Sequence, residues 1–378
     1  MSATIKPRFR RSNRPRKVRR TTRTTIFVAL ISLFYMLLMI PLLALEWISE
    51  GWWVGTVFAY SPRVVFLIPP VVFIMGSFLW HRKSIVVNLI SIVIAGGPLM
   101  HLHLPQLSIP ELPDTDQRIR FATCNVQGFE PDFGAVLTEL GARDPNVIVL
   151  QESIGDHSLI DQWFGEWNVY RTDSFLLASK FPLKHVETFY STVFAEHHGT
   201  DKRTTAVLVE IDGPTGRFRV VNVHLMTARH GLSTVTPGEV LRGGASSEIA
   251  GFDVLRQKEA DEALAFVQAI PADLPLIVAG DFNTPSHSNH FSSRWGFLRN
   301  VFEEVGFGYG YTAPNTQHKV WPDYTPWLRI DHILASDVWD LHRCEVGTGR
   351  GSDHRPIMAV LSLPVSQSKP DQLTDRSD

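Results

Sequence analysis

Three apolar runs in the first hundred residues constrain the architecture of this chain more than any other feature. The first covers residues 26–45, and two shorter ones cover residues 64–80 and 85–100. A helix needs about 20 mostly apolar residues to cross a bilayer, so the first run is long enough to do so. The sequence therefore predicts a transmembrane region over residues 25–100, with about three spanning helices.

A cleaved signal peptide and a re-entrant hairpin are the alternatives to this arrangement. A signal peptide has a shorter apolar core and a small-residue cleavage site, so residues 26–45 favour a retained anchor. Pro69, Pro70 and the segment Gly96-Gly97-Pro98 interrupt the two shorter runs, which could instead form a re-entrant hairpin. Three full spans are the expectation we carry forward.

Basic residues predict the orientation, because loops rich in Lys and Arg stay in the cytoplasm. Residues 1–24 hold ten bases and no acid and form a predicted basic cytoplasmic arm. Such an arm can bind nucleic acid, but beside a first span it is more often an orientation signal. The loop 46–61 has two acids and no base, whereas Arg82 and Lys83 lie in the next loop. We therefore expect a multi-pass protein of the cell (inner) membrane, extracytoplasmic after about His101.

The remainder of the chain has the composition of a folded domain between two flexible segments. Residues 101–117 are rich in Pro and polar residues and predict an extended linker. Residues 365–378 are mostly Ser, Gln, Lys, Pro and Asp and predict a disordered tail. Between them, residues 118–364 alternate short apolar strands with amphipathic helices, which predicts one catalytic domain.

Charge and cysteine content narrow the functional classes. Residues 101–378 carry a formal charge of −13 within a total of −2 for the chain. A domain this acidic lacks the positive surface that is usual for tight, non-specific binding to nucleic acid. Cys124 and Cys344 are the only cysteines, too few for a disulfide framework. Both fall in strand-like runs, and we expect buried small apolar residues.

Polar side chains follow several predicted strands at the point where each strand ends. Asn125 follows the run 121–124, Glu152 comes two residues after the run 147–150, and His224 ends the run 218–224. Later in the chain, the run 276–279 leads into Gly280-Asp281-Phe282-Asn283. Side chains at the ends of neighbouring strands can point into the same cleft, so these residues predict a shared site.

Two further strands complete this pattern. One covers residues 329–334 and contains Asp331, and the other covers residues 356–363, directly after Asp353 and His354. Several such strands with few helices favour an α/β sandwich of two mixed sheets over a doubly wound parallel sheet. Singly, an Asn or Asp after a strand is usually a turn former, so the prediction depends on the joint pattern.

Six motifs in this order resemble the endonuclease/exonuclease/phosphatase superfamily. They contain Asn125 in Cys-Asn-Val-Gln-Gly, Glu152 in Leu-Gln-Glu-Ser, His224 in Asn-Val-His-Leu, residues 280–284 (Gly-Asp-Phe-Asn-Thr), residues 329–332 (Arg-Ile-Asp-His) and residues 352–356 (Ser-Asp-His-Arg-Pro). The resemblance covers roughly residues 118–363 and implies a deoxyribonuclease-like two-sheet fold. The preceding spans resemble the membrane-anchored bacterial members.

The resemblance also implies a metal-dependent phosphoester hydrolase and a role for each motif residue. Glu152 would be the principal ligand of Mg²⁺, or of Mn²⁺ as an alternative, with Asn125 nearby and Asp353 helping. Asp331 would orient His354, which would activate water or stabilise the phosphorane, while Asp281 would orient or deprotonate the nucleophile. His224 and Asn283 would donate hydrogen bonds to phosphoryl oxygens. Whether Asp281 or His354 is the general base stays open at this stage.

Several histidines and aromatic residues have no motif role. Solvent-facing loop positions are expected for His197, His198, His230, His318 and His332. Packing under a long loop is expected for Trp321, Tyr324 and Trp327, with a grip on substrate as the alternative.

Three functional hypotheses remain. The first is a membrane-anchored phosphoesterase acting on a lipid-linked or other envelope phosphoester, with the bilayer and this substrate as partners. The second is an extracytoplasmic nuclease acting on DNA or RNA, and the third is a non-catalytic membrane protein that keeps the fold. No obligate protein partner is evident.

Overall fold

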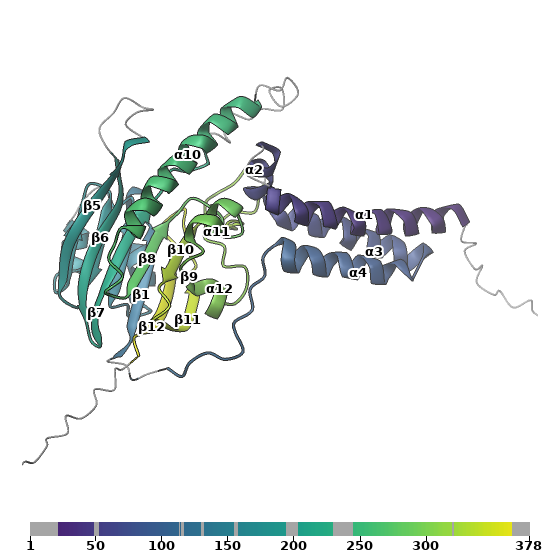
Figure 1. The fold of residues 1–378 in the computed structure, drawn as a ribbon. Helices are drawn as coiled ribbons and strands as arrows, with labels where there is room; N and C mark the ends of the chain where they lie inside the picture. The colour runs from purple at the N-terminus through teal and green to yellow at the C-terminus, as the bar shows by residue number, and fades with distance from the viewer. Residues whose placement is uncertain are drawn as a thin grey trace, which may run out of the picture.

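The computed structural model describes residues 22–48, 53–112, 114, 117–129, 132–154, 158–193, 203–229, 245–319 and 321–364. The predicted tail lies outside the described residues, and so does nearly all of the predicted basic arm. Figure 1 shows a domain of two sheets with helices on its outer faces, and a group of helices that projects from one side of this domain.

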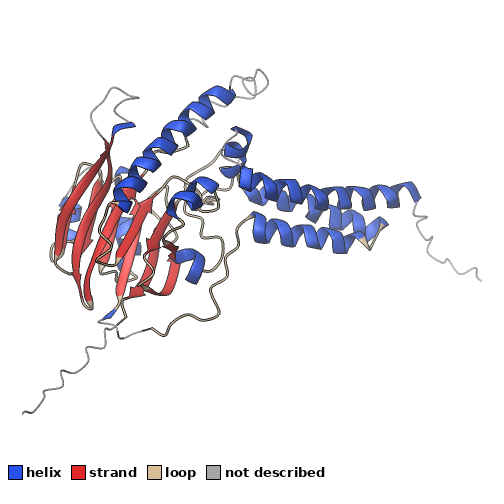
Figure 2. Ribbon diagram, in the orientation of Figure 1, coloured by secondary structure: helices blue, strands red, loops and turns tan. Residues whose placement is uncertain are grey.

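Two mixed sheets form the domain, with six strands each among the described residues, as Figure 2 shows in red. Their strand orders are β11-β12-β1-β2-β4-β3 and β5-β6-β7-β8-β10-β9. Strands β1 and β2 run parallel, as do β7 and β8, and the other neighbours are antiparallel. The predicted two-sheet α/β sandwich is therefore confirmed. The strands are β1 Ile119–Asn125, β2 Val147–Gln151, β3 Asn168–Arg171, β4 Phe175–Ser179, β5 Leu183–Ser191, β6 Arg203–Gly213, β7 Gly216–His224, β8 Leu276–Asp281, β9 Arg299–Asn300, β10 Asp331–Ala335, β11 Asp340–Val346 and β12 Ile357–Ser362.

The main core lies between the two sheets. Strand residues alternate between the two faces of a sheet, so Phe121 and Val149 of one sheet pack against Val220 and Ile277 of the other. Cys124 faces the other way and is a buried free thiol, as is Cys344 on β11, which confirms the expectation for both cysteines.

Helices cover the outer faces of both sheets. α5 (Phe133–Gly141) and α6 (Ser158–Trp163) pack on the first sheet, and α10 (Ala245–Gln268) and α11 (Asn289–Trp295) pack on the second. A short helix, α12 (Val301–Val305), packs beside the ends of the sheets. α5 begins at Asp132, whose side chain accepts a hydrogen bond from the amide of Ala135 at 3.0 Å, as expected for an N-cap.

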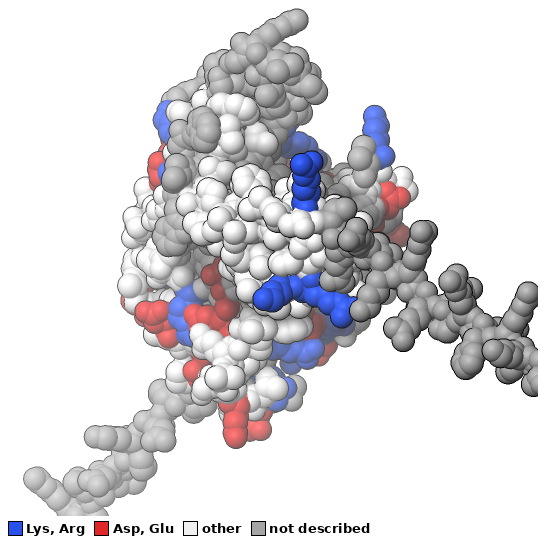
Figure 3. Space-filling view, turned by 90° about the vertical axis from the view of Figure 1, so that its right-hand side faces the viewer, with Lys and Arg blue, Asp and Glu red and all other residues white. Residues whose placement is uncertain are grey.

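The projecting group contains α1 (Thr22–Ile48), α2 (Trp53–Ala59), α3 (Ile68–Trp80) and α4 (Ser84–Ile94). Two of its helical segments, Thr22–Glu46 and Arg63–Trp80, are long and apolar enough to cross a membrane, while the apolar segment Ser84–Leu99 is shorter. Large apolar side chains such as Phe27, Phe34 and Met75 are more than 60% exposed. Figure 3 looks onto this side of the molecule and shows a largely uncharged surface on the helices.

The segment that follows these helices contacts the two-sheet domain. His103 and Gly308 exchange backbone hydrogen bonds of 2.9 and 3.0 Å, and the Gln106 amide donates to the carbonyl of Glu304 at 2.9 Å. The chain therefore runs along the domain surface between the last helix and β1, as Figure 1 shows.

Candidate active site

Strand register brings the predicted site residues to one end of the sandwich. In the first sheet, Asn125 at the end of β1 pairs with Gln151, the residue before Glu152. In the second sheet, Asp281 at the end of β8 pairs with both His224 on β7 and Asp331 on β10. β1, β2, β7 and β8 therefore end, and β10 begins, at the same end of the sandwich, each with a polar residue there.

Asn125 connects the two sheets at this end. Its side-chain amide donates to Glu152 Oε1 at 2.9 Å and to Asp281 Oδ2 at 3.0 Å. Asp281 is buried, whereas the side chain of Glu152 is 38% exposed. Glu152 has a φ of 52°, an uncommon value for a residue other than glycine, which turns its carboxylate toward the mouth of the site.

His354 lies at the centre of the site. Its Nδ1 is 2.8 Å from Asp331 Oδ2, and its Nε2 is 3.8 Å from Asp281 Oδ2. Burial by itself would lower the pKa of His354, but the carboxylates of Asp331 and Asp281 raise it to about 10. Burial, followed by the charge of Asp331, raises the pKa of Asp281 to about 7. The buried cluster thus favours the protonated forms of Asp281 and His354.

Asn283 and His224 lie around Asp281. The backbone amide of Asn283 donates to Asp281 Oδ1 at 2.9 Å, and its side-chain amide donates to Leu225 O at 2.8 Å. His224 Nε2 is 3.5 Å from Glu152 Oε1 and 3.7 Å from Asp281 Oδ2. Burial, followed by the charge of Arg203, holds the pKa of His224 well below its usual value. A neutral His224 can still donate one hydrogen bond to a phosphoryl oxygen.

Asp353, the last of the predicted site residues, lies between His354 and Arg229. Its Oδ1 is 3.9 Å from His354 Nε2, and its Oδ2 is 3.3 Å from Nη2 of the exposed Arg229. The structure therefore brings all eight predicted site residues into one cluster that both sheets build. The metal-binding and catalytic roles of these residues stay predictions.

The residues of this cluster fit a hard divalent cation. The cluster holds four carboxylates, those of Glu152, Asp281, Asp331 and Asp353, and potential ligand atoms of Asp281, Asp331 and His354 lie within 4.8 Å of one another. Asp331 Oδ1 is buried without a hydrogen-bond partner among the described residues. Carboxylates packed this closely need a cation or protons to offset their repulsion, and oxygen ligands suit Mg²⁺ or Mn²⁺. This compact group differs from the predicted ligand set Glu152, Asn125 and Asp353.

The sequence analysis missed several residues that hold the site in shape. Ser352 Oγ donates to Asn125 O at 2.7 Å and accepts from the amide of His354 at 3.1 Å. Between the two sheets, Gln151 Nε2 of β2 donates to Asn222 Oδ1 of β7 at 2.6 Å. Each of these residues lies within one of the six motifs, one or two positions from a predicted site residue, and an amide or hydroxyl beside a strand end was the signal available in the sequence.

One histidine prediction is wrong. His332 is not in a solvent-facing loop: it is 1% exposed on β10 and packs against Phe291 of α11 with a ring separation of 4.3 Å. It points away from Asp331 because neighbouring strand residues face opposite sides of a sheet. Half-buried His318 packs against Trp327, while His197, His198 and His230 lie outside the described residues.

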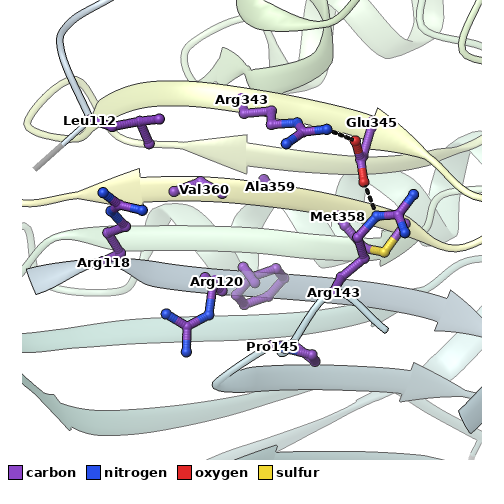
Figure 4. Close-up of a pocket in the computed structure, with 11 residues that line it drawn as sticks. Leu112, Arg118, Arg120, Arg143, Pro145, Arg343, Glu345, Met358, Ala359 and Val360 are labelled. Atoms are coloured by element: carbon purple, nitrogen blue, oxygen red, sulfur yellow. Dashed lines mark hydrogen bonds and ion pairs between the residues drawn. The ribbon is translucent and has the colours of Figure 1, made fainter. Parts of the chain in front are cut away.

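Two cavities adjoin the cluster, and a third lies elsewhere. A cavity of about 280 Å³ reaches His354 and Asn283, and one of about 660 Å³ reaches Asp353. A cavity of about 220 Å³ lies near the start of β1 and contains none of the predicted site residues. In Figure 4 its Arg143 and Arg343 both contact Glu345, so part of its positive charge is already neutralised.

Comparison with known proteins agrees with this architecture. The model of the endonuclease/exonuclease/phosphatase family matches residues 122–354, a range that holds all eight clustered residues. The chain belongs to the endonuclease/exonuclease/phosphatase family. No match was found among curated proteins.

Several solved structures are similar at low sequence identity. An endonuclease/exonuclease/phosphatase from Beutenbergia cavernae is 18% identical, with a TM-score of 0.46, over 65% of this chain and 72% of that one. A mannosyl-6-phosphatase from Bacteroides thetaiotaomicron is 15% identical, with a TM-score of 0.47, over 65% of this chain and 100% of that one. TDP2 from D. rerio, complexed with a single-strand DNA product, is 15% identical, with a TM-score of 0.45, over 65% and 100%.

Proposed function

We propose that this chain is a membrane-anchored, divalent-metal-dependent phosphoesterase whose substrate is a lipid-linked or other envelope phosphoester. The observation that carries this proposal is the pairing of His354 with Asp331 at 2.8 Å inside a cluster that also holds Asp281, Asn125 and Glu152. Family membership supports it, because members are typically phosphoester hydrolases that use a divalent cation.

Different side chains of the cluster would have different roles in phosphoester hydrolysis. A divalent cation, when bound, supplies positive charge against the charge that develops on the phosphoryl oxygens. Glu152, Asn125 and Asp353 would hold it, with Asp281 and Asp331 next to them. Asp331 fixes the ring of His354 through Nδ1, so Nε2 faces the site.

Proton transfer falls to Asp281 and His354. With the pKa of His354 raised to about 10, its Nε2 carries a proton at neutral pH, so Asp281 Oδ2, 3.8 Å away, would receive the proton of the attacking water. His354 Nε2 would take that role only when the imidazole is neutral. His224 borders the same space and would donate to a phosphoryl oxygen. The side-chain amide of Asn283 donates to Leu225 O and to Asp281 Oδ2, so Asn283 would have to give up one of these bonds to donate to the substrate. Burial of the cluster strengthens each of these interactions by lowering the local dielectric.

The membrane location is part of the proposal. Two apolar helical segments are long enough to span, and the proposal takes the shorter apolar segment Ser84–Leu99 as the third span. An odd number of spans places the catalytic domain on the side opposite the basic arm, and the distribution of bases favours an extracytoplasmic domain. Fusing a reporter enzyme after Pro105 tests this orientation. Reporter activity confined to the cytoplasm would contradict it.

The activity is tested with detergent-solubilised full-length protein, using bis-p-nitrophenyl phosphate, polyprenyl phosphate or phospholipid, and plasmid DNA. We expect Mg²⁺-dependent turnover that EDTA abolishes and that His354→Ala reduces strongly. Efficient DNA nicking without lipid turnover would favour the nuclease instead. Equal, metal-insensitive turnover by wild type and His354→Ala would favour the non-catalytic membrane protein.

A further inference from the structure

Tyr60, which lies between the two candidate spans, contacts the candidate active site. This residue follows α2 and stands three positions before the second candidate span, Arg63–Trp80. Its hydroxyl donates to the carbonyl of Asn283 at 2.9 Å, and its own carbonyl accepts from Trp327 Nε1 at 3.0 Å. Asn283 is one of the clustered site residues, so a residue from the helical region directly contacts that cluster.

Further contacts fix the position of Tyr60 relative to the catalytic domain. Arg256 on α10 donates to the Tyr60 hydroxyl, and its guanidinium lies 5.2 Å from the centre of the Tyr60 ring. Beside it, Arg63 Nη2 is 2.7 Å from His287 Nε2. Tyr309 and Tyr311 of the domain donate to Gly96 O and Met100 O, each at 2.9 Å. In Figure 1 this contact region lies around α2, between α1 and the domain.

The cavity beside Tyr60 has an apolar wall. Ala313, Leu328 and Ile330 form a buried apolar cluster, with Tyr60 and Trp327 packed against it. All five residues line the 280 Å³ cavity, which His354 and Asn283 also line. An apolar pocket with a few convergent polar groups is the usual form of a site for a small, partly apolar ligand.

The cavity on the other side of the cluster has a more polar lining. The 660 Å³ cavity is lined by Gln127, Asp132, Asn315, Arg350 and Asp353, among others. The segment 313–316 separates the two cavities: Ala313 and Pro314 face the apolar one, and Asn315 and Thr316 face the polar one. Of two adjacent site residues, His354 lines the apolar cavity and Asp353 lines the more polar one. The cluster therefore lies between the two cavities.

We propose that the cavity between Tyr60 and Trp327 binds the apolar chain of an amphiphilic phosphodiester, with the polar group of that substrate in the cavity beside Asn315. The scissile phosphorus then lies at the junction, next to His354. This inference rests on the proposed phosphoesterase function and specifies its substrate class. Because Tyr60 precedes a candidate span, the apolar cavity opens at the level where a lipid chain leaves the bilayer, and Tyr is favoured at that interface.

Alkyl p-nitrophenyl phosphodiesters provide the test, because chain length changes while the chromogenic leaving group stays the same. Full-length protein in a fixed detergent concentration with Mg²⁺ is assayed with the methyl, butyl and octyl esters. Trp327→Ala removes part of the wall of the apolar cavity, and Thr227→Phe adds bulk at another lining position. Phe297→Ala is the matched control, because Phe297 is 48% exposed and lines a different cavity.

We expect kcat/KM of the wild type to rise by about tenfold or more from methyl to octyl, since each buried methylene favours binding. Phe297→Ala keeps this dependence, and both cavity variants reduce it to about twofold or less. Two variants are used so that a folding defect in one does not decide the result. Turnover of the methyl ester that does not rise with chain length, or a rise retained in both cavity variants, overturns the inference and leaves the phosphoesterase proposal standing. Absence of metal-dependent turnover for every ester overturns both.

Discussion

His354 Nδ1 lies 2.8 Å from Asp331 Oδ2, and this pair connects the segment before β12 of one sheet to the start of β10 in the other. Replacing Asp331 by Asn removes the negative charge that holds the imidazole ring and raises its pKa. We expect kcat to fall by about 10²- to 10⁴-fold, the range of an acid or base contribution. The pH dependence of kcat/KM for bis-p-nitrophenyl phosphate should also shift. Asp337→Asn, an exposed acid, is the control, and an unchanged pH profile in Asp331→Asn would contradict this role.

Glu152 is the most exposed of the clustered carboxylates, with 38% of its side chain accessible, and it is the predicted principal metal ligand. Glu152→Gln keeps the shape but removes the charge, so the Mg²⁺ concentration for half-maximal activity should rise by about tenfold or more. Titration of activity with Mg²⁺ measures this shift. The control is Glu187→Gln on the exposed strand β5. An unaltered Mg²⁺ requirement in Glu152→Gln would assign the cation to the compact group Asp281, Asp331 and His354 instead.

Metal removal should make stability depend on pH through Asp281. The pKa of Asp281 is about 7 in the folded protein against an ordinary value of 3.8, so the native state favours the protonated carboxyl. This contribution to stability is fully present below the unfolded pKa and is lost as pH rises through about 7. His354, raised from 6.5 to about 10, acts in the same direction but at higher pH.

Thermal unfolding of the EDTA-treated protein at several pH values checks this expectation. The midpoint should fall as pH rises from 5 to 8, and Mg²⁺ should raise the midpoint more at pH 8 than at pH 5. Asp281→Asn should remove the part of the slope below pH 7. An unfolding midpoint that rises with pH in the metal-free wild type would show that the predicted direction of this pH dependence is wrong.

Gly280 is required by the close approach of β8 to β7. Its φ is 139°, and a Cβ atom there would lie 2.0 Å from the carbonyl oxygen of Val223. Gly280→Ala should therefore lower the free energy of unfolding by about 3 kcal/mol and displace Asp281, the next residue. Thermal unfolding measures the effect. Gly251→Ala in α10 is the control, because no atom lies within 4 Å of a Cβ there, and it should stabilise the helix slightly. Equal unfolding midpoints for the two variants would rule out this account.

The strand-end residues could be predicted from the sequence because their positions follow from local rules. Asn125, Glu152, His224 and Asp281 each come at or just after the end of a buried strand, and the ends of neighbouring strands meet at one edge of a sheet. The two-sheet sandwich followed from the number of strands and the scarcity of helices between them. Neither inference required knowledge of which distant segments touch.

What could not be predicted depends on contacts between distant segments. His332 is buried because α11 covers that face of β10, and the sequence pattern did not place α11. Tyr60 meets Asn283 across 223 positions of sequence, and residues before the catalytic domain were interpreted as membrane anchor alone. Periodicity gives the face of a strand but not the element that packs on it.

The contact between Tyr60 and Asn283 leads to a prediction about rate rather than substrate affinity. Asn283 has a φ of 48°, a strained value that its surroundings must hold, and the Tyr60 hydroxyl bonds to its carbonyl at 2.9 Å. Tyr60→Phe removes that bond but keeps the ring in the apolar cavity. We expect kcat for the methyl p-nitrophenyl diester to fall by about three- to tenfold while KM changes little, because a net hydrogen bond contributes about 1 kcal/mol. Tyr190→Phe, on an exposed side chain, should leave both constants unchanged. A rise in KM at constant kcat in Tyr60→Phe would show that the hydroxyl contributes to substrate binding and does not position Asn283.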